Sequence, residues 1–385
     1  MKRLYTNALI YNTDARGFLS GSMLVEDDKI AEFLPPDTIG VIGVDEKIDL
    51  DGARVIPGMI DMHTHGHGGY ESTAVDGDGM IKLAKSYASV GTTSFMPTLM
   101  SQPLEILEGA IDASKYAAAH AEPDCAHILG IHLEGRYISV EKKGAHNPDY
   151  IAPPNADELE RLIMRAKPLE RFHTICAPEV PGAEEMIRRA VSLGATVSIG
   201  HSNADCETCQ KAVEWGAKSY THLYNAMSAL KHRDPGCVGA AFAGDTFAEL
   251  ICDGVHIHHT AVKAAYRAIG NKRLVVVTDS APSAGLPEGE YVMGGARVVV
   301  RDGAVFLPDG TLTGGSISQF EAMKNLARFC SIPLEEAIPC ATANPAKLVG
   351  AYDEVGSLEV GKLADFIVLD KDNNIKQIFV GGVAL

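Results

Sequence analysis

Two histidines separated by one residue stand near the start of the chain. His63 and His65 end an apolar run that breaks at Pro57-Gly58 and then resumes. Such a run is typical of a buried parallel strand, and residues two apart on a strand point to the same side. Imidazole nitrogens bind borderline divalent ions such as zinc and iron(II). The motif therefore predicts two imidazoles side by side at one end of a strand, where a metal ion could bind.

Other apolar runs also end in residues that can ligate a metal. Glu134, His201, His222 and Asp279 each occupy such a position. A lone histidine in an apolar strand is usually a satisfied core residue, but ligand-type residues repeated at strand ends argue against that interpretation. Structural zinc is typically enclosed by Cys-rich spacing, whereas this set comes from separate strands, so it favours a catalytic centre and metal-assisted hydrolysis. The candidate metal ligands are His63, His65, Glu134, His201 and His222, with Asp279 the carboxylate beside them.

The elements that must position these residues form a regular repeat. Eight apolar runs alternate with helical patterns, which predicts an α/β fold with a (β/α)8 TIM-type barrel. The carboxyl ends of the strands share one face of such a barrel, so residues far apart in the chain converge there. The runs are 54–65, 93–100, 127–134, 173–179, 196–202, 219–225, 249–256 and 273–280, and the predicted helices are 79–90, 103–119, 156–166, 183–193, 206–215 and 260–269.

Both termini carry short β-type segments, at 5–11, 22–26, 29–33 and 47–50 and again at 364–370 and 375–380. Each group has too few strands to make a core alone. We therefore predict a small β-sandwich domain formed by residues 1–53 and 353–385, with the catalytic barrel at 54–352 inserted between them.

Composition bounds the partners. The 385 residues include 46% hydrophobic and 22% charged residues and carry a formal net charge of −16. A surface this acidic disfavours nucleic acid and anionic membranes. No apolar run reaches the ~18 residues that span a bilayer, and the first residues lack a signal-peptide core, so we expect a cytoplasmic protein. The eight cysteines are expected to be reduced core residues, with Cys206-x-x-Cys209 one turn of a helix.

These motifs resemble a known family. Pro57 to His65, together with Thr278-Asp279, resembles the amidohydrolase superfamily. More narrowly, seven segments resemble the N-acetylglucosamine-6-phosphate deacetylase family. They are 130–135, 142–148, 200–204, 221–227, 233–236, 253–256 and 312–315.

The resemblance implies removal of acetyl from N-acetyl-D-glucosamine 6-phosphate, with one or two divalent ions, zinc or iron, per subunit. It implies that Glu134, His201 and His222 hold the principal ion and that Asp279 is the general base and later the general acid. It also implies a homodimer in which Arg233 reaches the neighbouring site, although a solvated loop charge is the other interpretation of Arg233. The substrate-binding residues implied are Ala145, His146, Asn225, Ala226, Arg233, His256, Leu312 and Gly314.

The sequence departs from the family pattern at one position, and several histidines allow more than one role. Arg136 stands where the family usually has proline, so a cation at the mouth could add to the grip on an anionic substrate or change which sugar fits. His63 and His65 could hold a second, weaker ion, with Glu134 as the bridge. His132, two residues before Glu134, could support it. His67, His258 and His259 are expected in exposed loops or at a helix start.

Three other functions compete with the first. One is a deacetylase of another N-acetylhexosamine phosphate, such as N-acetylgalactosamine 6-phosphate. Another is a cyclic amidohydrolase or deaminase acting on a nucleobase-like ring, which would not need the phosphate-binding loops. The third is a non-catalytic scaffold, which the presence of every expected ligand and of Asp279 disfavours.

Overall fold

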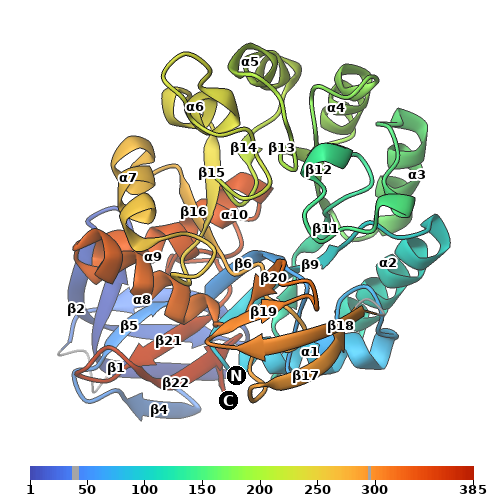
Figure 1. Cartoon of the computed structure of the whole chain (residues 1–385). Coiled ribbons are helices and arrows are strands. Elements are labelled where there is room, and N and C mark those ends of the chain that lie inside the picture. The colour runs from blue at the N-terminus through green and yellow to red at the C-terminus, as the bar shows by residue number, and fades with distance from the viewer. Residues whose placement is uncertain (37–42, 294–295) are drawn as a thin grey trace.

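The computed structural model describes residues 1–36, 43–293 and 296–385. Its centre is a ring of eight parallel strands in the order β6-β9-β11-β12-β13-β14-β15-β16, with the short β10 attached to β9 (Figure 1). Each strand matches one of the predicted apolar runs. The bounds are β6 (Met59–Thr64), β9 (Thr92–Leu99), β10 (His127–Ile128), β11 (Gly130–Leu133), β12 (Arg171–Cys176), β13 (Thr196–Ile199), β14 (Ser219–Tyr220), β15 (Phe247–Ile251) and β16 (Leu274–Val277).

The ring closes between its first and last strands. The amide of Asp279 donates to the carbonyl of His63, and the amide of His65 donates to the carbonyl of Ser280, both at 2.9 Å. Lower in the barrel, the Gln319 side chain donates to a carbonyl of each strand, Ile60 at 2.9 Å and Val276 at 2.6 Å. This seam brings the first histidine motif beside the last predicted carboxylate.

Helices surround the ring (Figure 1). Their bounds are α1 (Gly77–Ala88), α2 (Leu104–Ala119), α3 (Ala156–Ala166), α4 (Ala183–Ser192), α5 (Cys206–Trp215), α6 (Gly236–Ala243), α7 (His259–Ile269), α8 (Gln319–Cys330), α9 (Leu334–Ala341) and α10 (Ala343–Val349), with 3-10 turns at Val140–Lys142 and Pro148–Tyr150. The six predicted helices are confirmed within a few residues, and Cys206 and Cys209 lie in the first turn of α5 as predicted. No helix in the described parts of the chain is long and apolar enough to cross a membrane.

The two termini build one sheet. Its order is β23-β22-β21-β5-β1-β2-β3, with β4 also paired to β1. The Tyr5 ring lies against those of Phe366 and Phe379, at centroid distances of 5.0 and 5.2 Å, so the two ends share a core. The structure confirms that both termini join one sheet, which is one part of the predicted β-sandwich. The bounds are β1 (Lys2–Asn12), β2 (Gly17–Glu26), β3 (Lys29–Leu34), β4 (Glu46–Asp49), β5 (Arg54–Pro57), β21 (Phe366–Leu369), β22 (Ile375–Val380) and β23 (Val383–Ala384).

The predicted strand 54–65 is two strands. Residues 54–57 form β5, which pairs with β1 and β21 in the terminal sheet, and residues 59–64 form β6 in the barrel. Gly58 joins them where a Cβ would lie 2.0 Å from Thr93 Oγ1, so only glycine fits. The division into domains at 1–53, 54–352 and 353–385 stays a prediction, and residues 37–42 of it lie outside the described residues.

A small antiparallel insert follows β16. It contains β17 (Gly289–Met293), β18 (Ala296–Arg301), β19 (Ala304–Phe306) and β20 (Leu312–Gly315) and was not predicted. Gly315 joins it to the barrel, because its amide donates to the carbonyl of Asp279 at 2.6 Å and its carbonyl accepts from the amide of Ala281 at 2.9 Å. A two-stranded hairpin, β7 (Gly66–His67) and β8 (Tyr70–Glu71), follows β6. Both additions therefore stand at the end of the barrel where the predicted ligands lie.

Candidate active site

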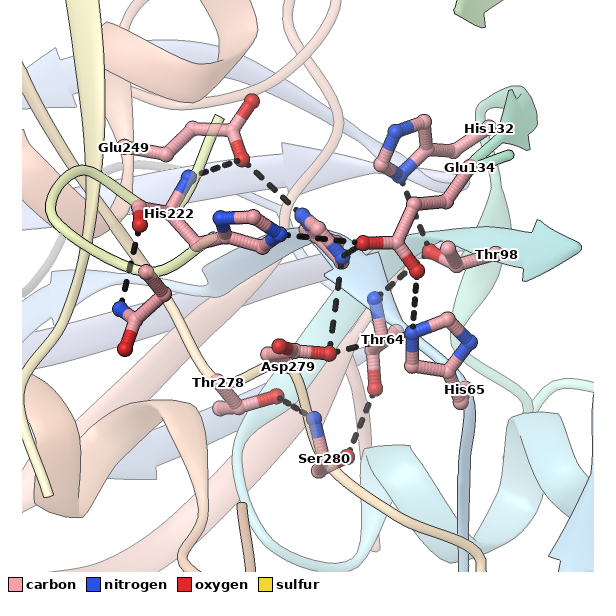
Figure 2. A network of polar contacts seen from close by, with 12 residues as sticks. Thr64, His65, Thr98, His132, Glu134, His222, Glu249, Thr278, Asp279 and Ser280 are labelled. Carbon is pink, nitrogen blue, oxygen red and sulfur yellow. Dashed lines mark hydrogen bonds and ion pairs between the residues drawn. The ribbon is translucent and has the colours of Figure 1, made fainter. Parts of the chain in front are cut away.

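All five predicted metal ligands meet around one carboxylate. Glu134 Oε1 lies 3.2 Å from Nε2 of both His201 and His222 and 3.3 Å from Nε2 of His63. The second oxygen, Oε2, lies 3.0 Å from Nε2 of His65. Figure 2 shows Glu134 between His222 and His65, with the ligands converging from separate strand ends. The structure thus brings together residues up to 159 positions apart in the chain.

Asp279 faces the same centre. Its Oδ1 lies 3.1 Å from His65 Nε2 and 3.5 Å from His63 Nε2 (Figure 2). His63, His65 and Asp279 form one group whose ligand atoms could hold an ion, and Glu134, His146 and His201 form another. The predicted base therefore stands beside the ligands, as the sequence indicated.

Three of these residues adopt left-handed backbone conformations. The φ angles are 46° at His201, 28° at His222 and 48° at Asp279. Each residue follows the end of its strand, where this turn stops the ladder. Such conformations are uncommon for residues other than glycine and are concentrated at functional sites.

Hydrogen bonds fix which ring nitrogens face the centre. His201 Nδ1 lies 2.7 Å from the carbonyl of Lys142, which can only accept, so Nδ1 carries the hydrogen and a neutral ring points the Nε2 lone pair inward. That lone pair lies 3.0 Å from His222 Nε2 and 3.2 Å from a Glu134 oxygen. Lone pairs this close repel one another unless a proton or a metal ion lies between them, and two imidazole nitrogens with a carboxylate oxygen form a donor set that fits a divalent ion.

The other histidine pair fits the same logic. His63 Nδ1 lies 3.0 Å from Glu249 Oε2, and His63 Nε2 has no hydrogen-bond partner among the described residues. Burial lowers the pKa of His63, but the charges of Glu134 and Asp279 outweigh burial and raise it well above its usual range. The balance is similar at His65, whose pKa rises to about 9. Without a metal, His63 and His65 bind protons, and the resulting positive charges balance the negative charges of Glu134 and Asp279.

The two carboxylates are held ionised. Burial opposes ionisation of Glu134, but the charges of His63 and His65 outweigh it and keep its pKa well below the usual range. For Asp279 the same two histidines overcome burial and lower the pKa to about 2. Both groups are therefore anions at neutral pH, as metal binding and general-base catalysis require.

Glu249 supports the site from below and was not predicted to act there. It is fully buried in β15, contacts His63 through Oε2, and lies 3.5 Å from His173 Nε2 through Oε1. Burial raises its pKa, but the bonds from His173 and His63 prevail and lower the pKa to about 2. The available signal was a carboxylate at the start of the otherwise apolar run 249–256. His132 likewise lies behind the ligands, its ring 4.5 Å from that of His63.

A cavity of about 190 Å3 opens over these residues. It is lined by Glu134, His201, His222, His65 and Asp279, and Met100, Gly144 and Thr313 line it without having been predicted. The predicted substrate-binding residues on its wall are Ala145, His146, Asn225, Ala226, His256, Leu312 and Gly314.

Two cations lie away from this cavity. Arg233 is exposed in the loop before α6. Arg136 donates to Glu158 Oε1 at 2.8 Å and to the carbonyl of Gln102 at 2.9 Å. The guanidinium of Arg136 is thus neutralised beside α3, and it is not among the residues that line the cavity.

The histidines just outside the ligand motifs differ in their exposure. His67 was expected to be exposed, and this was wrong: it is 7% exposed because the β7–β8 hairpin holds it against α1, with Nδ1 2.7 Å from Ser86 Oγ. His258 and His259 are exposed at the start of α7, as predicted, and His258 caps that helix. His256 Nδ1 lies 2.6 Å from Asp253 Oδ2, which orients its ring.

Several classes of metal-binding barrel enzyme have histidine and carboxylate side chains at the carboxyl ends of a closed ring of parallel strands. Comparison with known proteins identifies the family to which this chain belongs. The amidohydrolase family model matches residues 54–385, and the chain belongs to this family.

Individual relatives within the family have named activities. An N-acetylglucosamine-6-phosphate deacetylase of Vibrio furnissii is 34% identical over 338 residues, covering 88% of this chain and 84% of that protein. An N-acetylgalactosamine-6-phosphate deacetylase of Shewanella sp. (strain ANA-3) is 35% identical over 339 residues, covering 87% and 84%. The crystal structure of N-acetylglucosamine-6-phosphate deacetylase from Pasteurella multocida superimposes with a TM-score of 0.91 at 32% identity and full coverage of both chains.

Proposed function

We propose that this enzyme removes the N-acetyl group of N-acetyl-D-glucosamine 6-phosphate by metal-dependent hydrolysis, giving glucosamine 6-phosphate and acetate. The observation that carries the proposal is the convergence of Glu134, His201 and His222 within 3.2 Å of one another, beside Asp279 and on one cavity. The named activities of the relatives support the same reaction.

Glu134, His201 and His222 would hold the principal ion, zinc or iron(II), because their donor atoms are two imidazole nitrogens and a carboxylate oxygen. When bound, such an ion polarises the amide carbonyl and makes a water molecule more acidic. His63 and His65 would hold a second, weaker ion, with Glu134 between the two. Glu134 contacts all four histidines, His201, His222 and His63 through Oε1 and His65 through Oε2, which supports its place between the two ions.

Asp279 would move the proton. As an anion on the cavity wall it accepts a proton from the attacking water while the water oxygen bonds to the amide carbon. The resulting carboxylic acid then gives this proton to the amide nitrogen as the C–N bond breaks. The nitrogen leaves as a neutral amine, which is a far better leaving group than an amide anion. His146 lies 3.5 Å from Glu134 and can help to stabilise the developing negative charge.

The phosphate would bind at the other end of the cavity. Asn225, the backbone of Ala226 and His256 line that end, with Leu312 and Gly314 from the insert beside them. Burial lowers the pKa of His256, but the bond and charge of Asp253 outweigh it and raise the pKa, which favours an imidazolium that can bind phosphate. Arg233 would reach this phosphate from a neighbouring subunit of a homodimer, since its exposed loop lies outside the cavity of its own chain.

The galacto epimer is the second candidate substrate. The Shewanella relative, named as an N-acetylgalactosamine-6-phosphate deacetylase, favours this candidate. Its sequence identity to this chain equals that of the relatives named as N-acetylglucosamine-6-phosphate deacetylases, to within about one percent. An assay of acetate release from both epimers of N-acetylhexosamine 6-phosphate, each beside its unphosphorylated sugar, decides between them. We expect the gluco phosphate to be the best substrate. Failure to release acetate from either phosphate would refute the proposal, and so would release of ammonia from a cyclic amidine or ring opening of a cyclic amide instead.

A further inference from the structure

A second cavity adjoins the catalytic one. Its volume is about 510 Å3, against about 190 Å3 for the first. His65, Met100, Ala145 and Thr313 line both cavities and so form the wall between them. Beyond this wall the second cavity has an apolar side, with Tyr150, Pro282, Val298 and Leu307, and a polar side, with Glu71, Ser101, Gln102 and Asn147.

The wall stands at the metal end of the catalytic cavity. His65 is itself one of the candidate ligands, 3.0 Å from Glu134. Met100 directly follows β9, and hydrogen bonds fix the backbone on both sides of it: the carbonyl of Leu99 accepts from the amide of Glu134 at 2.9 Å, and the amide of Ser101 donates to His146 at 3.3 Å. The flexible Met100 side chain is therefore placed between the reacting centre and the second cavity.

The phosphate end lies across the barrel from this wall. Asn225 and Ala226 follow β14, which is four strands from β9 in the ring of eight. Asn225, Ala226 and His256 line the first cavity and, within the described part of the chain, do not line the second. A sugar held by its phosphate at β14 and β15 and by its amide carbonyl at the ligands directs its acyl chain toward β6 and β9.

We propose that Met100 determines the length of the acyl chain that this enzyme removes. This inference rests on the proposed function. The thioether side chain closes the catalytic cavity behind an acetyl group, and the apolar side of the second cavity accepts the methylenes of a longer N-acyl chain once that side chain is shortened. Burying each methylene in an apolar cavity gains about fourfold in transition-state binding, so two methylenes gain about tenfold or somewhat more.

The test measures kcat/KM for N-acetyl- and N-butyryl-glucosamine 6-phosphate. In Met100→Ala the butyryl-to-acetyl ratio should rise about tenfold over the wild-type ratio, and in Met100→Leu, which keeps the bulk, it should stay within about twofold. Adding Leu307→Trp to Met100→Ala places an indole on the apolar side of the second cavity and should lower the ratio toward the wild-type value. Leu307→Trp alone should leave N-acetyl hydrolysis unchanged, because Leu307 does not line the catalytic cavity in the described structure.

The outcomes separate the two proposals. A wild-type enzyme without activity on the N-acetyl substrate refutes the proposed function. An active wild type whose ratio is unchanged in Met100→Ala overturns the role of Met100, and so does a raised ratio that survives Leu307→Trp, because the longer chain then lies elsewhere. Met100→Val provides the same test if the alanine variant loses N-acetyl activity, and its ratio should rise by an intermediate amount.

Discussion

Truncation of Glu249 should selectively weaken binding of the second ion that we propose at His63 and His65. Glu249 is completely buried, and its Oε2 is the acceptor for His63 Nδ1 at 3.0 Å. In Glu249→Ala this N–H loses its acceptor where water is excluded. The ring is then no longer held with its Nε2 toward Glu134, the geometry that a ligand needs.

The size of the effect follows mainly from the contact with His63, because the bond that Glu249 Oε2 also accepts from the backbone amide of His222 is longer, at 3.4 Å. A buried donor left without a partner costs about 1–3 kcal/mol. At about 1.4 kcal/mol per factor of ten, this corresponds to roughly a 5- to 150-fold loss of affinity. Removal of the group that orients a ligating histidine typically costs about 10- to 100-fold in metal affinity, so the two estimates agree. His201 keeps its own acceptor, the carbonyl of Lys142, and the amide of His222 loses only a long bond of 3.4 Å, so the affinity for the principal ion should fall by less than the affinity for the second ion.

Zinc titration of chelator-treated protein in a competing metal buffer measures both affinities. Thr196→Val is the matched control: it removes a buried hydrogen bond of the same network, 2.7 Å from His173 Nδ1, without touching a residue that contacts a ligand. Both affinities should stay within about twofold in the control. A second-ion affinity that is unchanged in Glu249→Ala would refute the reasoning, and a wild type that binds one equivalent would remove the second site altogether.

Three further predictions concern the base, the metal-free protein and the phosphate. Asp279→Asn should lower kcat by about 10^3-fold with metal content unchanged, since a general acid–base group contributes about 10^2- to 10^4-fold, and a kcat above a tenth of the wild-type value would exclude Asp279 as proton carrier. In chelator-treated protein the pKa of His65 is raised from 6.5 to about 9, so its stabilising contribution is complete below pH 6.5 and is lost as the pH rises through 9. The melting temperature should fall over that interval, less so in His65→Asn, and equal slopes in the two proteins would contradict the assignment. Asp253→Asn removes the carboxylate that raises the pKa of His256, so KM for the phosphorylated sugar should rise about tenfold with little change in kcat, whereas KM for the unphosphorylated sugar should not change.

The convergence of the candidate ligands could be predicted from the sequence because strand ends are marked locally. Each of His63, Glu134, His201 and His222 directly follows or ends an apolar run, and the carboxyl ends of parallel strands in a barrel meet on one face. No knowledge of which strand lies beside which was needed. The order of the ring, observed as predicted, then brought these residues together.

The features that could not be predicted from the sequence depend on contacts between residues far apart in the chain. Glu249 matters because His63 lies against it, although they are 186 residues apart. Arg136 was expected near the substrate, but Glu158, one turn into α3, takes up its charge. His67 is buried by a helix that packs over its hairpin. The periodicity of one segment predicts which side of an element is buried, but it does not identify the partner of a single polar group.

The left-handed turns at the strand ends bear on how this protein would respond to selection for stability alone. A strained backbone conformation costs on the order of 1–3 kcal/mol per residue, and His201, His222 and Asp279 each have one. Glycine at these positions would relieve that strain, yet it would remove the ligands and the base. A lineage released from the need for catalysis would therefore be expected to gain stability by losing this site first, so its retention in a sequence is itself a sign that the chemistry is in use.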